Sequence, residues 1–215
     1  MHVVSVNIGR ERSLSSGKKL ETTGIFKVAT SEAVLVTELG LRGDFVCDAR
    51  NHGGPDQAVY VYGQADYDWW AGELGQPMAP GTFGENLTIS ELESAAFTIG
   101  DRLQMDEVIL EVSAPRIPCA TLAARMGDPR FVKRYRQAER PGLYCRVIQP
   151  GSLRVGENVR IEKYVGESIS VLEMFRTFYD KHKSEAELRR QLKVPIAIRA
   201  RVDLEEELRR ALEGK

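Results

Sequence analysis

The stretch Val108-Ile-Leu-Glu-Val-Ser-Ala-Pro-Arg-Ile-Pro-Cys119 passes from a strand-like run into a proline-interrupted segment that ends at a cysteine. Pro115 and Pro118 fix φ and remove backbone donors, so we expect the strand to end before them. The next segment, 120–126, consists mainly of good helix formers. The sequence therefore predicts a strand, a rigid turn and a helix, with Cys119 in the first helical turn.

That position favours a reactive thiol. The N-terminal end of a helix carries partial positive charge and Arg116 adds a full charge nearby, so both should lower the pKa of the Cys119 thiol. A thiolate can attack an electrophile or bind a metal ion. The alternative is that Cys119 is a small buried hydrophobic residue, a common environment for free cysteines. The local sequence leaves both interpretations open.

The chain has 215 residues, 28% of them charged, with a net charge of -1. This length suits one large domain, or one domain with a small appendage, and can bury a core without disulfides. The near-zero net charge predicts neither a nucleic-acid partner nor an anionic membrane surface. We expect a cytoplasmic protein, because the N-terminus lacks the features of a secretory signal and no apolar run approaches the roughly 20 residues of a membrane span.

The cysteines are also typical of a cytoplasmic protein. Cys47, Cys119 and Cys145 are an odd number of thiols at distant positions, which is typical of reduced cysteines. Cys47 and Cys145 lie in strand-like runs, and we expect both to be packing residues. No zinc-ligand spacing, Walker loop, dinucleotide motif or Gly-x-Ser-x-Gly elbow is present in the sequence.

Short alternating runs broken by glycine and proline dominate the chain up to about residue 165. So many short strands predict a mainly β fold, a β-barrel, with peripheral helices over 64–74 and from Asp128-Pro129 towards 137. The strand candidates include 3–8, 33–39, 45–48, 58–62, 86–89, 102–105, 108–113, 143–148 and 158–163.

Beyond residue 165 helical periodicity takes over. Ser170-Val-Leu-Glu173 and Ser184-Glu-Ala-Glu187 have the pattern of a capping box, and Asp203 with Glu206 marks a third helix start. Three short helices are therefore predicted.

These helices would form a C-terminal module over 166–215, following a domain over 1–165, with Gly214 as the last C-cap. Their apolar stripes are thin for a unit of this size. We therefore expect the module to pack on the barrel, on another subunit in a homodimer, or on both.

A glycine-rich segment, Arg50-Asn-His-Gly-Gly-Pro-Asp56, joins two strand candidates. Gly53 and Gly54 allow the backbone to approach a ligand closely or to take a positive φ. Arg50 and His52 would offer a cation and a hydrogen-bonding ring to an anionic or heteroaromatic ligand. A tight turn needs the same glycines and proline, so a binding loop and a plain turn both remain possible.

Two further segments carry candidate polar residues. In Phe83-Gly-Glu-Asn-Leu87, Glu85 and Asn86 could orient a ligand or bond the turn itself. Lys27 follows Thr22-Thr-Gly-Ile-Phe, where a lone lysine is usually solvated.

Six segments in order over most of residues 1–165 resemble the MOSC family, the domain found at the C-terminus of molybdenum-cofactor sulfurases, and specifically its stand-alone bacterial YiiM-like members. The helices after the barrel are similar to the three-helix extension of those members. The segments are Thr23-Gly-Ile-Phe-Lys27, Leu39-Gly-Leu-Arg-Gly-Asp44, His52-Gly-Gly-Pro-Asp56, Phe83-Gly-Glu-Asn-Leu87, Ile99-Gly-Asp101 and Pro115-Arg-Ile-Pro-Cys119.

This resemblance implies a MOSC-type β-barrel that binds the molybdenum cofactor (molybdopterin), with Cys119 as a ligand to molybdenum. It also implies that Lys27 and Arg50 serve the reaction beside Cys119. The residues expected to contact the cofactor are His52, Gly53, Gly54, Phe83, Gly84, Glu85, Asn86 and Arg116.

The sequence departs from the family in one position and lacks two appended regions. Gln57 stands where the family usually has a basic residue, which puts phosphate binding there in doubt. The chain lacks the pyridoxal-phosphate-dependent desulfurase region of the large sulfurases. Three scattered cysteines cannot ligate an iron–sulfur cluster, so an external electron donor is needed.

Two hypotheses from different classes follow. In the first, the protein is a molybdenum-cofactor-dependent reductase of N-hydroxylated bases, such as N-hydroxylaminopurine. In the second, Cys119 carries a persulfide, taken from a sulfur donor, for metal or cofactor assembly. A third reading, a barrel that only binds ligands, requires a buried and unreactive Cys119.

Overall fold

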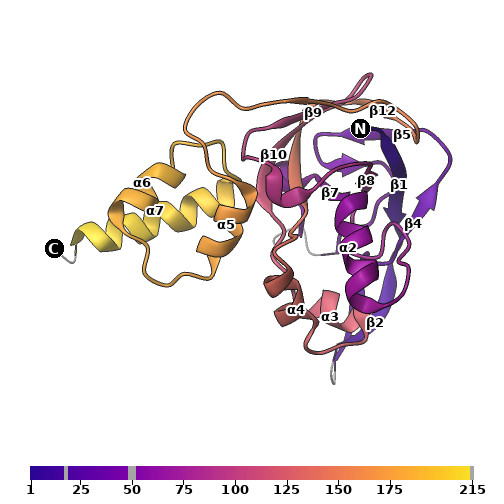
Figure 1. Cartoon of the computed structure of the whole chain (residues 1–215), viewed down its shortest axis with the longest axis horizontal. Coiled ribbons are helices and arrows are strands. Elements are labelled where there is room, and N and C mark those ends of the chain that lie inside the picture. Colours follow the sequence, from indigo (N-terminus) through magenta and orange to yellow (C-terminus); the bar gives the residue numbers. More distant parts are fainter. Residues whose placement is uncertain (17–18, 48–51, 214–215) are drawn as a thin grey trace.

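The computed structural model describes residues 1–16, 19–47 and 52–213. Figure 1 shows a sheet-rich body on one side and a lobe of C-terminal helices on the other, with the chain's N-terminus on the body and its C-terminus at the far end of the lobe. The predicted mainly β fold, with peripheral helices and a C-terminal three-helix extension, is confirmed in this part of the chain.

The main sheet runs in the order β13-β9-β10-β11-β7-β8-β1-β4, eight strands within the described residues. Neighbours pair antiparallel, apart from the parallel pair β7 and β8. The strands are β1 (Val3–Gly9), β4 (Lys27–Thr30), β7 (Val59–Gly63), β8 (Leu87–Ile89), β9 (Arg102–Gln104), β10 (Ile109–Pro115), β11 (Leu143–Gln149) and β13 (Arg160–Glu162).

Backbone bonds bring the two ends of this sheet together. Val3 N donates to Glu157 O at 2.9 Å, and Gly156 N donates to Val3 O at 2.8 Å. The first strand therefore meets the segment that leads into β13, although β1 and β13 lie near opposite ends of the strand order. The sheet consequently curls around an apolar interior.

Smaller elements complete the body. A second sheet has the order β12-β5-β6, and β2 pairs with β3 as a hairpin. The bounds are β2 (Arg12–Ser16), β3 (Lys19–Thr23), β5 (Val34–Thr37), β6 (Gly40–Leu41), β12 (Gly151–Leu153), η1 (Pro55–Gln57), α2 (Gln64–Leu74), η2 (Ser94–Ala96), α3 (Ala120–Met126) and α4 (Phe131–Ala138). The helix predicted over 64–74 is confirmed as α2.

Some sequence predictions for the body were wrong. Residues 45–47 form no strand; Asp48 lies outside the described residues. That segment is instead held by polar contacts, with Phe45 N donating to Gly9 O at 3.0 Å. β10 extends to Pro115, two residues further than predicted, after a register irregularity between Val112 and Ala114. Pro115 is tolerated there because it stands at the end of the strand.

The helix predicted from Asp128-Pro129 begins later, at Phe131. Asp128 still organises the turn before it, since its Oδ1 accepts from Arg130 N at 2.8 Å. The carbonyl of Asp128 also accepts from Phe131 N, so the residue acts three positions before the first residue of the helix.

Three helices follow the last strand within the described part of the chain: α5 (Val171–Phe178), α6 (Glu185–Gln191) and α7 (Ile198–Glu213). The capping box at Ser184 and Glu187 is confirmed, and Ser170 caps α5 by accepting from Glu173 N. The helix start predicted at Asp203 is wrong, because Asp203 lies inside α7. Gly214, the predicted C-cap, lies outside the described residues.

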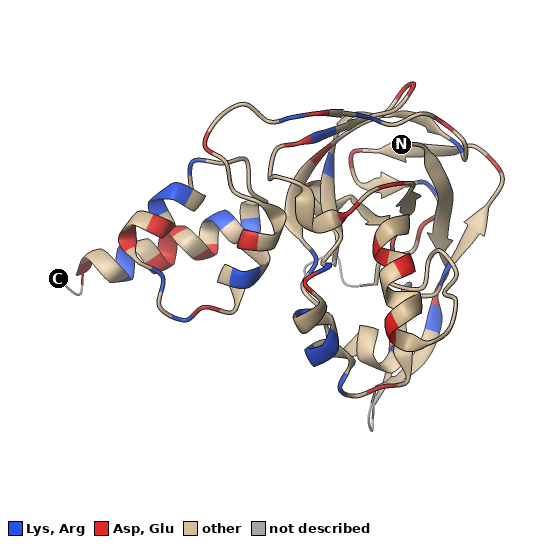
Figure 2. Ribbon diagram, viewed as in Figure 1, with Lys and Arg blue, Asp and Glu red and all other residues tan. Residues whose placement is uncertain are grey.

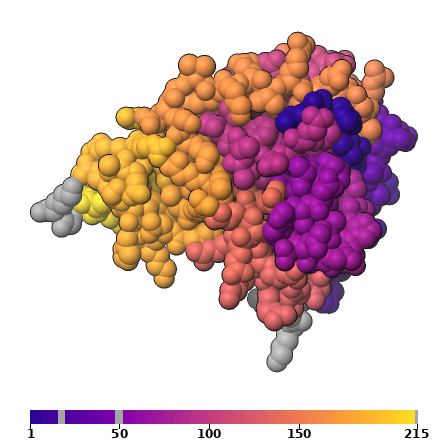
Figure 3. Space-filling model, in the orientation of Figure 1, coloured from indigo at the N-terminus to yellow at the C-terminus, as the bar shows by residue number. Residues whose placement is uncertain are grey.

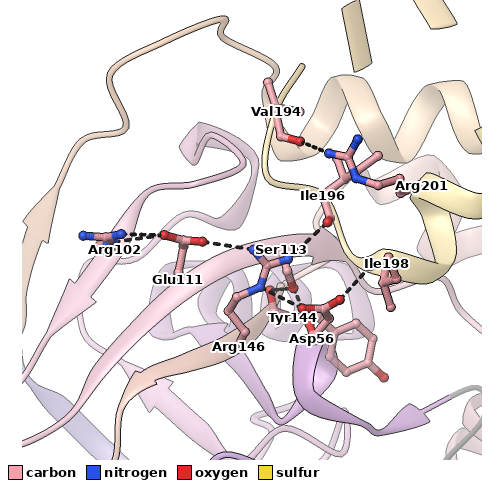
Figure 4. Close-up of polar contacts among 10 residues, drawn as sticks. All are labelled: Asp56, Arg102, Glu111, Ser113, Tyr144, Arg146, Val194, Ile196, Ile198 and Arg201. Atoms are coloured by element: carbon pink, nitrogen blue, oxygen red, sulfur yellow. Dashed lines mark hydrogen bonds and ion pairs between the residues drawn. The ribbon is translucent and has the colours of Figure 1, made fainter. Parts of the chain in front are cut away.

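α7 begins where a distant carboxylate meets it (Figure 4). Asp56 Oδ2 accepts from Ile198 N at 2.6 Å, across 142 positions of sequence, and its Oδ1 accepts from Arg146 Nε at 2.8 Å. Arg146 also donates to the carbonyl of Ile196 and pairs with Glu111. This network ties the start of α7 to β11 and to the loop that carries His52.

The helical lobe shares the core of the body. Buried side chains from the lobe, such as Val171, Leu188 and Leu204, belong to the same apolar cluster as Val112 and Leu103 of the sheet. Figure 3 shows the lobe (orange to yellow) in continuous contact with the rest of the molecule, and the ribbon in Figure 2 shows basic (blue) and acidic (red) positions interleaved along its helices. The predicted packing of the module on the body is confirmed.

An aromatic cluster fills the space under α2, α3 and α4. Trp70 is fully buried and stacks on Phe131, with ring centroids 5.1 Å apart. Its Nε1 donates to the Tyr62 hydroxyl at 2.9 Å, so the buried indole is satisfied. This cluster supports one side of the strand end from which Cys119 follows.

None of the helices in the described ranges combines the length and the apolar character that crossing a membrane would require.

Candidate functional site

A cavity of about 520 Å³ lies where loops of the sheet meet the start of α3. Its volume falls in the range of roughly 300–1,000 Å³ typical of small-molecule sites. Among the residues predicted for the site, the structure brings the following into its wall: Lys27, His52, Gly84, Asn86, Arg116 and Cys119. Segments far apart in sequence therefore converge on one concavity.

Cys119 is the N-cap of α3 and is half-buried. Burial alone would raise the pKa of its thiol, but a hydrogen bond with His52 and the positive charge of Arg116 outweigh that effect and lower the pKa to about 6. At neutral pH the sulfur is therefore mainly a thiolate. The alternative, a buried and unreactive cysteine, does not fit this environment.

His52 lies directly before the paired glycines of the glycine-rich loop, beside Cys119. Its Nδ1 lies 3.4 Å from the Tyr144 hydroxyl, which holds the ring against β11. Gly54 takes a φ of 86°, a left-handed conformation that glycine adopts without strain, and η1 begins directly after it. The paired glycines thus shape the loop, and neither Gly53 nor Gly54 lines the cavity.

Lys27 and Asp44 form a nearly buried ion pair, with side chains 8% and 5% exposed. Lys27 Nζ lies 2.6 Å from Asp44 Oδ1, and Asn86 Nδ2 donates to Asp44 Oδ2 at 2.9 Å. Burial lowers the pKa of the Lys27 ammonium, and the neighbouring Asp44 carboxylate only partly offsets that effect. The pair places the Lys27 ammonium group on the cavity wall.

Arg116 is 4% exposed and lies over the ring of Tyr60, with its Cζ 5.4 Å from the ring centroid. Its Nη1 is buried and has no hydrogen-bond partner. Unpaired buried donors are rare and costly, so such an atom beside a cavity is a natural anchor for an acceptor on a ligand.

Other residues predicted for the site lie elsewhere. Phe83 and Glu85 are buried and do not line the cavity. Glu85 Oε1 accepts from Tyr67 at 2.7 Å, from Gly81 N at 2.5 Å and from Thr88 at 3.0 Å, which makes it an internal anchor of its loop. Arg50, predicted to be catalytic, lies outside the described residues.

The structure adds residues that the sequence did not single out. Asp44, Tyr60 and Tyr144 all line the cavity. Asp44 ends one of the six family-like segments, and alternation along β7 and β11 could have placed Tyr60 and Tyr144 on one face of the sheet. Gln57, noted in the sequence because it stands where the family usually has a basic residue, lines the cavity as well.

The remaining cysteines have different environments. Cys145 is buried in β11, as expected, and burial raises its pKa far above the usual range. Cys47 was predicted to be a packing residue, and this was wrong, because it is exposed and lines the cavity. The segment that contains Cys47 follows Asp44, which is held by Lys27 and Asn86, and it does not continue as a strand.

The donor set fits a cofactor that brings most of its own metal ligands. Within the described ranges no group of three His, Cys, Asp or Glu side chains could hold a metal ion. A single thiolate with cations around it instead suits a metal already held by dithiolene sulfurs on an anionic organic molecule. Cys119 would add one soft ligand, and the unpaired Nη1 of Arg116 would bind an acceptor on the organic part.

Comparisons with known proteins identify the class. The family model of the MOSC domain matches residues 48–160. YflK of Bacillus subtilis is 37% identical over 191 residues, which are 88% of this chain and 86% of YflK. The chain therefore belongs to the MOSC domain family.

One further relative and one solved structure are also similar to this chain. A Gibberella moniliformis protein named Reductase is 30% identical over 188 residues, which are 85% of this chain and 33% of that protein. The crystal structure of YiiM from Geobacillus stearothermophilus superposes with a TM-score of 0.79 at 24% identity, covering 96% of this chain and 98% of that one. This last similarity extends the shared fold to the C-terminal helices.

Proposed function

We propose that the protein binds the molybdenum cofactor in the 520 Å³ cavity, through Cys119, and reduces N-hydroxylated bases or related compounds. The observation that carries the proposal is the half-buried sulfur of Cys119 on the wall of that cavity, beside His52 and Arg116, which lower the pKa of its thiol. Membership of the MOSC family and the reductase name of the Gibberella relative support a cofactor-dependent reductase in general terms.

The reaction requires two electrons and two protons. An N-hydroxylated amine accepts both, the N–O bond breaks, and the products are the amine and water. An external electron-donor protein supplies the electrons. The bound cofactor would contribute the metal centre at which oxygen is removed from nitrogen.

The protein's own groups would orient the reactants and handle protons. Cys119 would hold the cofactor, and Arg116 would bind an acceptor on its organic part. Lys27 would donate a proton to the departing oxygen, because burial lowers the pKa of its ammonium and so eases proton release. Asp44 keeps that ammonium pointed at the cavity wall.

The test is to load the purified protein with molybdenum cofactor, add a chemical reductant and follow conversion of 6-hydroxylaminopurine to adenine. We expect conversion by the native chain, its loss in Cys119→Ala, and its retention in Cys145→Ala, whose thiol is buried away from the cavity. Equal conversion by native and Cys119→Ala protein would refute the role of the sulfur.

The same experiment also distinguishes the reductase from the alternative, a sulfur-carrier protein. If Cys119 instead carries sulfur, the loaded protein gives no conversion. Incubation with a cysteine desulfurase then adds one sulfur to the intact mass of the native chain and none to Cys119→Ala.

A further inference from the structure

A second cavity, of about 740 Å³, opens between the body and the C-terminal helices. The body contributes Pro115 and Ile117 to its wall, and the helical lobe contributes Met174, Phe178 and Leu204. Apolar side chains therefore lie on both sides of the cavity, and the volume suits a small organic molecule.

Both cavities meet at the reactive sulfur. Their walls share His52, Gln57, Cys119, Thr121 and Tyr144. A molecule in the second cavity would therefore border Cys119, as would a molecule in the first. Two cavities that share one thiolate suit two ligands that must come together there.

Gln57 supplies a recognition group at this junction. Its Oε1 is buried and has no hydrogen-bond partner, whereas its backbone N donates to Gly54 O at 3.1 Å. A buried amide oxygen without a donor is costly, so an N–H group of a ligand would satisfy it. The basic residue usual in the family could not accept such a bond.

The charges around the second cavity balance. Lys183, only 10% exposed, pairs with Glu207 at 3.0 Å, and Arg199 and Asp203 add one charge of each sign. The four charges sum to zero, and the Lys183–Glu207 pair offers a charged ligand no free partner. A neutral ligand with an apolar ring and polar edges fits them better.

We propose that the second cavity is the substrate site and takes a neutral, planar heteroaromatic amine, with Gln57 Oε1 accepting from its exocyclic N–H. The ring packs between the apolar wall of the body and α5 and α7. This inference rests on the proposed reductase function, since it divides that function between a cofactor cavity and a substrate cavity that meet at Cys119.

Binding can be measured without cofactor, on the full chain, with adenine as the probe. We expect a calorimetric binding signal and slower alkylation of Cys119 when adenine is present. Gln57→Leu should weaken binding by about tenfold, because it keeps the shape and removes the acceptor. Ala200→Phe, which fills the cavity from α7, should abolish both signals.

Gln104→Leu is the matched control, because Gln104 lies on β9 and lines neither cavity. Unchanged adenine affinity in both Gln57→Leu and Ala200→Phe would overturn the assignment, as would the absence of adenine binding to the native chain. Gln57 Oε1 makes no hydrogen bond within the folded protein, so Gln57→Leu breaks none there. This variant therefore tests the site even if Ala200→Phe fails to fold.

The outcomes separate this inference from the proposed function. If cofactor-loaded protein reduces 6-hydroxylaminopurine equally well with Ala200→Phe, the cavity assignment fails and the reductase stands. If adenine binds as expected and the loaded protein performs no reduction, the cavity stands as a ligand site and the reductase fails.

Discussion

The thiol of Cys119 has a low pKa because of one neighbour from a distant part of the chain and one that is close in sequence. His52 enters from the glycine-rich loop, whereas Arg116 lies three residues before the cysteine. The Tyr144 hydroxyl from β11 holds His52 in place. The reactivity of this thiol thus depends on a contact made only in the folded site as well as on the local sequence.

Alkylation of Cys119 should follow a single ionisation near pH 6. Below that pH the sulfur is protonated and slow to react; above it the thiolate persists, and the rate levels off. His52→Ala should move the midpoint upwards, towards the usual value of about 8.5, because it removes the hydrogen bond that favours the thiolate. Iodoacetamide rates measured by peptide mass over a range of pH check this, and a native midpoint at the usual value would contradict it.

Glu85 should be a structural residue. Glu85→Ala leaves Tyr67, Gly81 N and Thr88 without their acceptor, so we expect a loss of stability of about 3 kcal/mol. Glu73→Ala, on the exposed side of α2, should change stability by less than about 0.5 kcal/mol. Urea unfolding measures both. A normal stability for Glu85→Ala would show that the carboxylate is dispensable for the loop.

At the scale of elements, one carboxylate holds together the His52 loop, β11 and the start of α7. Asp56 accepts from Ile198 N and from Arg146, and Arg146 reaches the carbonyl of Ile196 (Figure 4). The helix start is thus determined by a tertiary contact. Sequence patterns record only local caps, which explains why Asp203 was wrongly predicted to begin this helix.

Asp56→Ala should loosen the start of α7. Two hydrogen bonds to a charged group are lost, so we expect a decrease in stability of roughly 2–3 kcal/mol and faster amide hydrogen exchange over 196–201. Asp203→Ala is the matched control, because Asp203 is exposed inside the helix and caps nothing. Equal effects of the two substitutions on exchange at 196–201 would favour the helix start at Asp203.

Local patterns predicted the elements whose signals are local. α2, the caps at Ser170 and Ser184 and most strands of the main sheet follow from periodicity and capping residues. The hairpin of β2 and β3 was missed because it contains few apolar residues; Leu20 within it is 73% exposed.

The site was predicted in part for a similar reason. Family-like segments identified Lys27, His52, Arg116 and Cys119, which do converge. They could not distinguish a glutamate that lines a cavity from one that anchors a loop, as Glu85 does, since both occur in the same motif. The second cavity depends on how α5 and α7 dock on the body, which no single motif encodes.

For the whole molecule, the body and the helical lobe should unfold together. Buried residues of both belong to one apolar cluster, so neither can lose its packing without exposing the other. Urea curves from tryptophan fluorescence, which reports on Trp69 and Trp70 in α2, should coincide with curves from far-UV circular dichroism. Two separate transitions would show instead that the lobe over 166–215 is an independent folding unit.

The most direct test of the central claim is molybdenum X-ray absorption on cofactor-loaded protein. Cys119 should contribute one molybdenum–sulfur contact beyond those of the cofactor's own dithiolene, and Cys119→Ser should lack it while Cys145→Ala keeps it. Identical sulfur coordination in native and Cys119→Ser protein, both fully loaded, would contradict the assignment of Cys119 as the ligand.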